Sequence, residues 1–352
     1  MTTPQHGRYP ASNFVVLQTP SGRSRAEVLT DCGFNCARWS LSRDDQALEI
    51  LWPGISAIGS TSRPDAPADI LSPFRFGIPV LFPFPNRICR GVYHWSGREY
   101  RLPINDPQQR HAIHGFVADR PWTSLRATEQ SSAAQVTGQF RLSQHAPDRL
   151  SLWPADFTLT LTWQLRELPD PPPSAALSAQ VIVANDDTVP LPFGLGFHPY
   201  FAVPADDAQV SIFSAQKPGA ELRHWELHDF IPTGRLLPLR PSDRRLVDDT
   251  LTGPLPPWDD AFRIFPADAA DPTVVLVRDC KRRFAIRVEA EPVFRDLVLF
   301  VPPHRQAVCV EPYTCVTDAI NLHQRGVASG LRILQPGQEW RTSLTITVFP
   351  EP

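Results

Sequence analysis

Glu311 has the side chain and the setting of a proton-transferring residue. It follows the apolar run Val308 to Val310 and stands directly before Pro312. Apolar residues at successive positions predict a strand covered on both faces, where a carboxylate costs several kcal/mol unless it is paired or hydrogen-bonded. The proline ends the strand, which suits a side chain at the rim of a cleft. A structural ion pair with a buried arginine is the competing interpretation.

His198 is the second candidate for acid–base chemistry. It lies between Phe197 and Pro199 in the apolar, glycine-bearing segment Leu191 to Phe201. Proline restricts the backbone of the preceding residue, and glycines allow a ligand or another chain to approach closely. The residue types alone leave two interpretations open, a catalytic histidine and a hydrogen-bonded histidine of the core.

Arg87, His111 and His114 form the third group of candidate residues. Arg87 comes directly after the apolar run Ile78 to Pro85, and is either a ligand-binding cation or a structural ion-pair partner. His111 and His114 suggest metal ligands, but residues three apart on a strand point to opposite faces. We therefore expect no metal site.

Two adjacent aspartates, Asp259 and Asp260, lie between Trp258 and Phe262. Such a pair is typical of a turn with solvated carboxylates, unless one of them belongs to a site, and the sequence does not indicate which. The chain has no nucleophile-elbow or phosphate-loop motif. Covalent acyl chemistry and nucleotide hydrolysis therefore have no support.

The elements that position these residues are predicted to be strands. Proline supplies 39 of the 352 residues and is spread along the chain, which leaves few intervals for a long helix. Residues 159–165 and 344–348 alternate apolar and polar side chains, as half-buried antiparallel strands do. Residues 274–277, 284–288 and 297–301 are short β-rich runs. The predicted fold class is all-β, with two or more packed antiparallel sheets.

The composition indicates a single domain, residues 1–352, whose strands are joined by short turns. Ser96-Gly97 has the residue types of a two-residue hairpin turn. Residues 60–69 and 169–174 resemble linkers, but the composition does not change across either, so both are interpreted as long surface loops.

Charge and composition exclude several classes of partner. The net charge is −3, from 34 Lys and Arg against 37 Asp and Glu, whereas nucleic acids and anionic membranes select basic proteins. No apolar run approaches the roughly 18 residues of a membrane span. The six cysteines form no Cys-x2-Cys pair, which is typical of reduced, mostly buried thiols. We expect a cytoplasmic monomer or dimer.

Taken in order, several segments resemble the aldose 1-epimerase (galactose mutarotase) family across roughly residues 15 to 349. The matching segments include Phe76-Gly77-Ile78-Pro79, Pro85-Asn86-Arg87-Ile88, His114-Gly115, Gly196-Phe197-His198-Pro199-Tyr200-Phe201, Asp259-x-x-Phe262, Glu311-Pro312 and the terminal Pro336-Gly337. The resemblance implies a large antiparallel β-sandwich, sometimes called a supersandwich. That fold agrees with the strands predicted independently above.

The resemblance also implies a reaction and a set of roles. His198 would be the general acid and Glu311 the general base. Arg87, His114 and Asp259 would hold a small sugar. The reaction would interconvert the α and β anomers of a free hexose, without a cofactor or a metal.

Sugar ring opening suits these residue types. A proton must leave the anomeric hydroxyl and another must reach the ring oxygen. Ordinary pKa values of about 4.3 and 6.5 leave glutamate ionised and histidine partly protonated near neutrality. We expect burial to raise the pKa of Glu311 and a neighbouring carboxylate to keep His198 protonated.

Two alternatives accompany this hypothesis. Phe116 follows His114-Gly115 where galactose-acting members usually carry a second glycine, which looks closer to the hexose-6-phosphate 1-epimerase branch or to the broader uncharacterised epimerase-like group. Arg90, Arg110 and Arg120 lie nearby in the sequence and would suit a phosphate. The other alternative is a non-catalytic carbohydrate-binding β-sandwich.

Overall fold

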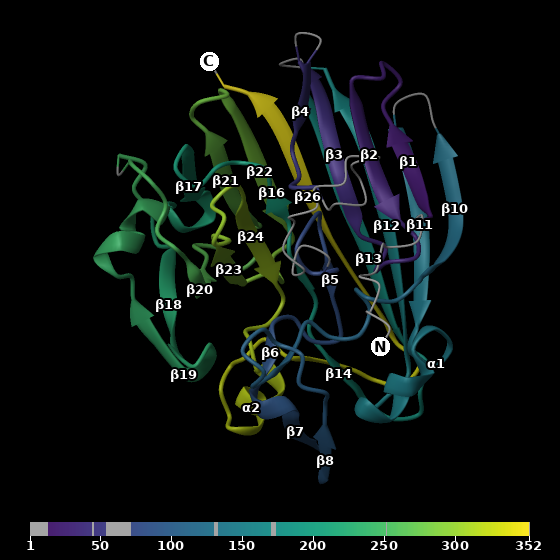
Figure 1. The fold of residues 1–352 in the computed structure, drawn as a ribbon. Helices are drawn as coiled ribbons and strands as arrows, with labels where there is room; N and C mark the ends of the chain where they lie inside the picture. The colour runs from purple at the N-terminus through teal and green to yellow at the C-terminus, as the bar shows by residue number, and fades with distance from the viewer. Residues whose placement is uncertain are drawn as a thin grey trace, which may run out of the picture.

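The computed structural model describes residues 13–43, 46–53, 72–129, 133–169, 174–250 and 252–351. Figure 1 shows antiparallel sheets packed face to face, and within the described residues only two short α-helices, α1 (Leu142–His145) and α2 (Ala319–Gln324). The predicted all-β class is confirmed. The predicted loop 60–69 lies outside the described residues, as do residues 170–173 of the second predicted loop.

One layer is an eight-stranded antiparallel sheet. Its strands, in spatial order, are β10 (Thr123–Glu129), β11 (Ala133–Arg141), β12 (Phe157–Leu168), β13 (Ser174–Asn185), β26 (Glu339–Pro350), β22 (Phe284–Ala290), β21 (Thr273–Asp279) and β17 (Ala208–Ile212). The alternating segments 159–165 and 344–348 lie in β12 and β26, as predicted.

The facing layer contains a second eight-stranded sheet. Its order is β19 (Ile231–Pro238), β18 (Glu221–His228), β20 (Asp259–Phe265), β23 (Asp296–Phe300), β24 (Val308–Tyr313), β15 (Gly196–Phe197) and β5 (Val80–Leu81), and β16 (Tyr200–Phe201) pairs with β24 beside this order. All six residues of β24 are buried, which confirms a strand covered on both faces.

A four-stranded sheet extends the facing layer. It runs in the order β1 (Phe14–Gln18), β2 (Ser24–Leu29), β3 (Cys36–Arg43) and β4 (Gln46–Glu49). Strands β1 and β2 contact β11 and β12, and Figure 1 shows this sheet over that half of the large sheet. Isolated bridges link Cys36 of β3 to Ile78, two residues before β5, and Leu51, two residues after β4, to Phe201 of β16.

The core lies between these layers because one face of each strand is apolar. In β12, every second residue from Phe157 to Leu165 is buried, and the threonines between them are half-buried. Phe157 packs edge-on against Phe82, and Trp163 packs against Phe197 of the facing layer. Burial of each large apolar side chain contributes roughly 1.5–3 kcal/mol.

Three pairs of short strands complete the described fold. They are β6 (Arg87–Ile88) with β9 (Ala112–Ile113), β7 (Val92–Trp95) with β8 (Arg98–Arg101), and β14 (Leu191–Phe193) with β25 (Arg332–Leu334). The β7–β8 turn is Ser96-Gly97, as predicted, and both residues have positive φ, 47° and 77°. Positive φ at both central positions is the signature of a type I′ hairpin.

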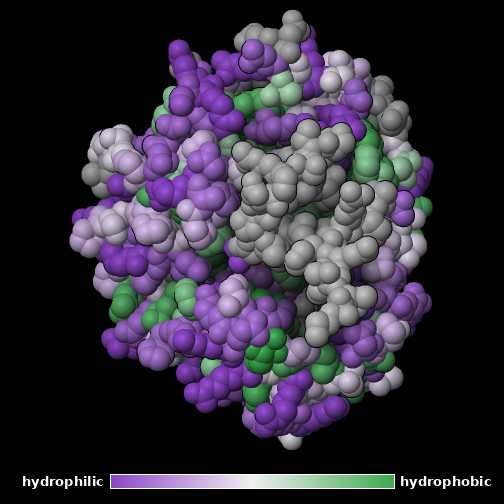
Figure 2. Space-filling model, in the orientation of Figure 1, coloured by the Kyte–Doolittle hydropathy of each residue, from purple (hydrophilic) through white to green (hydrophobic). Residues whose placement is uncertain are grey.

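The molecular surface agrees with a chain whose apolar side chains are mostly inside. Figure 2 shows a face on which the coloured residues are mainly hydrophilic and the hydrophobic ones occupy small areas. In the part of the chain that the structure describes, no helix is long and apolar enough to cross a membrane. All six cysteines are free thiols.

Candidate active site

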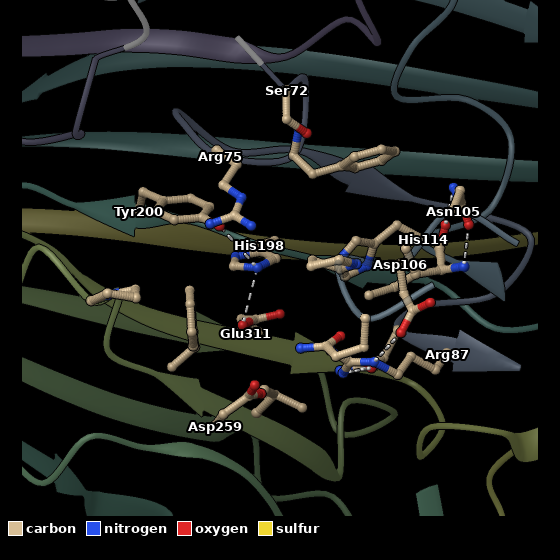
Figure 3. Close-up of a pocket in the computed structure, with 18 of the residues that line it drawn as sticks. Ser72, Arg75, Arg87, Asn105, Asp106, His114, His198, Tyr200, Asp259 and Glu311 are labelled. Carbon is tan, nitrogen blue, oxygen red and sulfur yellow. Dashed lines mark hydrogen bonds and ion pairs between the residues drawn. The ribbon is translucent and has the colours of Figure 1, made fainter. Parts of the chain in front are cut away.

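One cavity of about 470 Å³ is lined by all five residues predicted to form a site (Figure 3). They are Arg87, His114, His198, Asp259 and Glu311. They come from five separate segments of the chain, so only the fold brings them together. A cavity of this volume lies within the usual range for small-molecule sites, about 300–1,000 Å³.

The register of two short strands places His198 opposite Glu311. Gly196 of β15 pairs with Tyr313, and Tyr200 of β16 pairs with Cys309. His198 lies midway between these two pairs, and so does Glu311 on β24. Antiparallel neighbours at opposed positions have Cβ atoms about 4.5–5.5 Å apart, so the sheet itself brings the imidazole and the carboxyl into contact.

The two side chains meet inside the cavity. His198 Nε2 lies 3.3 Å from Glu311 Oε1, and both side chains are buried. The Tyr313 hydroxyl donates a hydrogen bond to Glu311 Oε2. The Tyr200 ring stacks on the His198 ring at 4.5 Å, with its hydroxyl 3.3 Å from Nε2. The pair therefore has fixed partners on both sides.

Burial shifts the pKa values of this pair in opposite directions. It raises the pKa of Glu311 well above its ordinary value, although the Tyr313 hydrogen bond acts the other way. It lowers the pKa of His198 to about 3, and the nearby Arg75 guanidinium adds to this effect. The expectation that a neighbouring carboxylate keeps His198 protonated was wrong, because desolvation by burial is the largest effect on the pKa of His198 and lowers it.

The pair therefore favours a neutral imidazole beside a protonated carboxyl. Counted from a neutral imidazole beside a carboxylate, that state holds one additional, titratable proton. An imidazolium beside a carboxylate holds the same number, and transfer of one proton across the 3.3 Å contact interconverts the two states. Groups coupled this closely titrate as a unit rather than as separate residues.

His114 faces this pair from another wall. Its ring centre lies 5.6 Å from that of His198, and burial lowers its pKa well below 6.5. Among the described residues, its Nδ1 atom has no hydrogen-bond partner. The next residue, Gly115, has φ of +73°, and a Cβ there would lie 2.1 Å from the Phe82 carbonyl oxygen. The glycine lets the chain turn and place a neutral imidazole in the cavity.

Asp259, rather than Asp260, lines the cavity. Asp260 points elsewhere, with one oxygen 3.1 Å from His224 Nε2 and the other accepting a 2.8 Å hydrogen bond from Arg240. Successive residues of a strand point to opposite faces, so the start of β20 separates the two carboxylates. Burial raises the pKa of Asp259, while the Arg87 charge opposes this shift.

Arg87 is buried, lines the cavity and also has structural contacts. Its Nη1 donates a 3.0 Å hydrogen bond to Asn86 Oδ1. Its guanidinium carbon lies 4.5 Å from the centre of the Phe230 ring. Its Nε lies 3.9 Å from Asp106 Oδ2, an ion-pair distance. The structure thus shows Arg87 in an ion pair, as one interpretation of the sequence held, and also in the cavity lining.

His111 lies outside the cavity lining, unlike His114. Its Nδ1 accepts a hydrogen bond from the Arg90 backbone N–H, and its Nε2 lies 3.5 Å from Asp229. Within the described residues, no group of three or more His, Cys, Asp or Glu side chains is arranged to hold a metal ion.

The three arginines suggested for phosphate do not line the cavity either. Arg110 pairs with Asp229 at 2.5 Å, and Arg120 pairs with Asp148 at 2.6 Å. Arg90 is exposed outside the lining. The positions of these three arginines therefore do not support a phosphate-binding pocket.

Sequence reasoning missed several residues of the lining and its support. Tyr200 and Tyr313 each lie two positions after a predicted catalytic residue, and period-two alternation would have placed each on the same strand face as that residue. Arg75 also lines the cavity, but it precedes the first strand of its sheet and has no periodic pattern to reveal it.

Known structures and sequences resemble this chain over different extents. A galactose mutarotase-like protein from Clostridium acetobutylicum has a TM-score of 0.75 and 20% identity, with 94% of this chain and 93% of that chain covered. Galactose 1-epimerase from Lactobacillus acidophilus has a TM-score of 0.68 and 15% identity, with 97% and 99% covered. At these identities the likeness shows a shared fold.

Two curated relatives from Escherichia coli match a shorter region. The uncharacterized protein YihR is 35% identical over 121 residues, which are 34% of this chain and 34% of YihR. The uncharacterized protein YphB is 28% identical over 121 residues, 34% of this chain and 35% of YphB. Each match thus spans about a third of the relative's length.

The family comparison covers most of the sequence. Residues 61–347 match the aldose 1-epimerase family, and this range includes every residue of the pair and of the cavity wall discussed above. With the shared fold, this match establishes that the chain belongs to the aldose 1-epimerase family.

Proposed function

We propose that this protein is an aldose 1-epimerase that interconverts the α and β anomers of a free hexose by acid–base ring opening. The observation that carries the proposal is the contact between His198 and Glu311. An imidazole and a carboxyl group 3.3 Å apart line a cavity large enough for a sugar ring. Both groups are buried, which excludes most competing water from the proton transfers.

In the proposed reaction, Glu311 as carboxylate takes the proton of the anomeric hydroxyl. His198 as imidazolium gives its proton to the ring oxygen, and the bond between the anomeric carbon and the ring oxygen breaks. Rotation about the adjacent carbon–carbon bond presents the other face of the aldehyde. The two residues then reverse roles and the ring closes. The reactive state has the same proton count as the neutral pair.

The surrounding side chains suit this chemistry. The Tyr313 hydroxyl donates to Glu311 Oε2 and thereby stabilises the carboxylate form. Arg87, His114 and Asp259 would hold the sugar hydroxyls from the remaining walls. Arginine is always charged at neutral pH and donates in a fixed geometry, so it orients oxygen atoms without taking part in proton transfer.

Two observations favour this function over its alternatives. Arg110 and Arg120 are engaged in ion pairs outside the lining, so they offer a sugar phosphate no binding site. A purely sugar-binding protein would not require a buried acid and base in contact, because burial of ionisable groups lowers stability.

Polarimetry on freshly dissolved α-glucose, α-galactose and glucose 6-phosphate tests the proposal. We expect the protein to accelerate mutarotation of at least one free sugar above the spontaneous rate, and to act on the phosphate ester far more slowly. A preference for glucose 6-phosphate would favour the phosphosugar branch. Unchanged spontaneous rates for every sugar would favour a binding protein.

The pH dependence of kcat/KM should follow the coupled pair. Below its lower macroscopic pKa, both His198 and Glu311 are protonated and no base is available. Above the upper value, the shared proton is gone and no acid is available. Since burial lowers the pKa of His198 to about 3 and raises that of Glu311, we expect a bell whose acid limb lies below the ordinary range of histidine.

This profile can be measured from about pH 4 to about pH 9, with the spontaneous rate subtracted at each pH. An acid limb centred near pH 6.5, the ordinary pKa of histidine, would show that His198 titrates like an exposed imidazole. That result would contradict the effect of burial on this pair.

A further inference from the structure

Arg87 and Asp106 are neighbours in the lining of the cavity, and each has one polar side-chain atom without a hydrogen-bond partner among the described residues. Arg87 Nε and Asp106 Oδ2 are 3.9 Å apart, which is too far for a hydrogen bond. Their side chains are only 7% and 0% exposed. Among the residues that the structure describes, neither atom has a hydrogen-bond partner. Both residues line the cavity.

The rest of each side chain is firmly held, so the two atoms cannot close this gap easily. Asp106 Oδ1 accepts hydrogen bonds from the backbone N–H groups of Arg110 and His111, at 2.6 and 2.7 Å. Arg87 Nη1 donates to Asn86 Oδ1 at 3.0 Å. An unsatisfied buried polar group costs about 1–3 kcal/mol, and native structures leave few of them. A buried donor and a buried acceptor side by side, neither with a hydrogen-bond partner among the described residues, therefore indicate a ligand group.

We propose that Asp106 is a substrate-binding residue, and that one sugar hydroxyl bridges Arg87 Nε and Asp106 Oδ2. The hydroxyl oxygen would accept from the arginine and donate its proton to the carboxylate. An oxygen about 2.8 Å from both atoms spans their separation at an angle of about 90°. A hydroxyl is the group of a sugar that donates and accepts at once. The inference rests on the proposed function, because it takes a sugar as the ligand.

This contact lies apart from the proton-transfer pair. Asp106 belongs to residues 102–111, which join β8 to β9, and Figure 3 shows Arg87 and Asp106 on the side of the cavity away from Tyr200. The bridged hydroxyl is therefore one remote from the anomeric carbon. It would determine which sugars bind, and a phosphate in its place would meet the Asp106 carboxylate.

Sugars that lack one hydroxyl at a time test this role in the wild-type protein. We expect one ring position at which the deoxy sugar raises KM by about 10- to 100-fold, as for a lost hydrogen bond to charged groups. The deoxyfluoro sugar at that position should not restore binding, because fluorine cannot donate to a carboxylate. Small, equal effects at every position would overturn the proposal.

The Asp106→Asn variant tests the same contact from the protein side. Its amide oxygen can still accept from the Arg110 and His111 backbone, so the loop is expected to fold. Its NH2 group would face Arg87 Nε, donor against donor. We expect KM for the parent sugar to rise about tenfold or more, with kcat changed less than about threefold and discrimination against the sensitive deoxy sugar lost.

Asp229→Asn is the matched control, because Asp229 contacts Arg110 and His111 of the same loop and does not line the cavity. It should keep the wild-type discrimination. Its loss in this control would assign the effect to the loop and overturn the role of Asp106.

The wild-type rate on the parent sugar separates the two proposals. Turnover with equal KM for all deoxy sugars refutes only the role of Asp106. Absence of turnover refutes the proposed function. In that case, calorimetric titration with the same sugars measures their Kd values in place of KM. Equal Kd values for the parent and deoxy sugars would then overturn the Asp106 proposal as well.

Discussion

Replacement of Glu311 by glutamine is expected to lower kcat/KM by about 10³-fold. The amide has nearly the size of the carboxyl and can still accept the hydrogen bond of the Tyr313 hydroxyl, but it cannot take a proton from a sugar. Loss of one general base typically costs about 10²–10⁴ in rate. Polarimetry with the best free sugar measures the effect.

Glu289→Gln is the control for this substitution. Glu289 lies on β22, and its side chain is 45% exposed beside Arg287. We expect its activity to match the wild type. A Glu311→Gln protein that is folded and retains more than about a tenth of the wild-type rate would contradict the role of general base.

The Glu311→Gln variant should be at least as stable as the wild type at neutral pH. Burial raises the pKa of Glu311 above the 4.5 of an ordinary glutamate. The stability that this carboxyl contributes is therefore complete below about pH 4.5, and is lost as the pH rises through its raised value in the folded state. Glutamine has no such dependence. The difference in Tm, variant minus wild type, should increase with pH above 4.5, and circular dichroism can follow it.

Replacement of His198 by glutamine is expected to lower kcat/KM by about 10²–10⁴-fold. Glutamine can place an NH2 group near the former position of Nε2, so it can still donate a hydrogen bond to Glu311. It cannot deliver a proton to the ring oxygen. The loss should appear in kcat more than in KM, because the interaction that disappears is needed in the transition state.

His94→Gln is the control for the histidine. His94 is 63% exposed and contacts Glu99 in the β7–β8 hairpin, away from the cavity. We expect its rate to equal that of the wild type. A folded His198→Gln protein with wild-type kcat would assign the proton delivery to another group.

The double variant distinguishes a coupled pair from two independent residues. Since an acid and a base that act in one proton cycle fail together, the double variant should be about as slow as the slower single variant. A loss equal to the product of the two single losses would contradict the coupling inferred from the His198 Nε2 to Glu311 Oε1 contact.

The strands were largely predictable because their patterns are local. Alternation in residues 159–165 and 344–348 requires only that one face of a strand is buried, and both segments are strands. The pairing order was not predictable from these patterns. β26 lies between β13 and β22, and nothing in its own residues specifies neighbours so distant in the chain.

The candidate site was predictable in part, for a different reason. The resemblance to the family indicated His198 and Glu311, whereas their contact depends on the register of β24 with β15 and β16. The pKa of His198 could not be inferred, because burial is a property of the folded chain. Asp106 escaped notice because it lies in a loop, where no periodicity marks an inward-facing side chain.

The residues that line the cavity lie on strands and on a surface connection, and these two kinds of backbone differ in how well they tolerate substitutions and insertions. The proposed acid–base pair, His198 and Glu311, is positioned by the pairing of β24 with its neighbours, whereas Asp106 lies in residues 102–111 between β8 and β9. Insertions or substitutions in a surface connection disturb a fold much less than changes in a central strand. Under the proposed roles, changes in this connection alter the sugar preference of relatives while the proton-transfer chemistry is inherited unchanged.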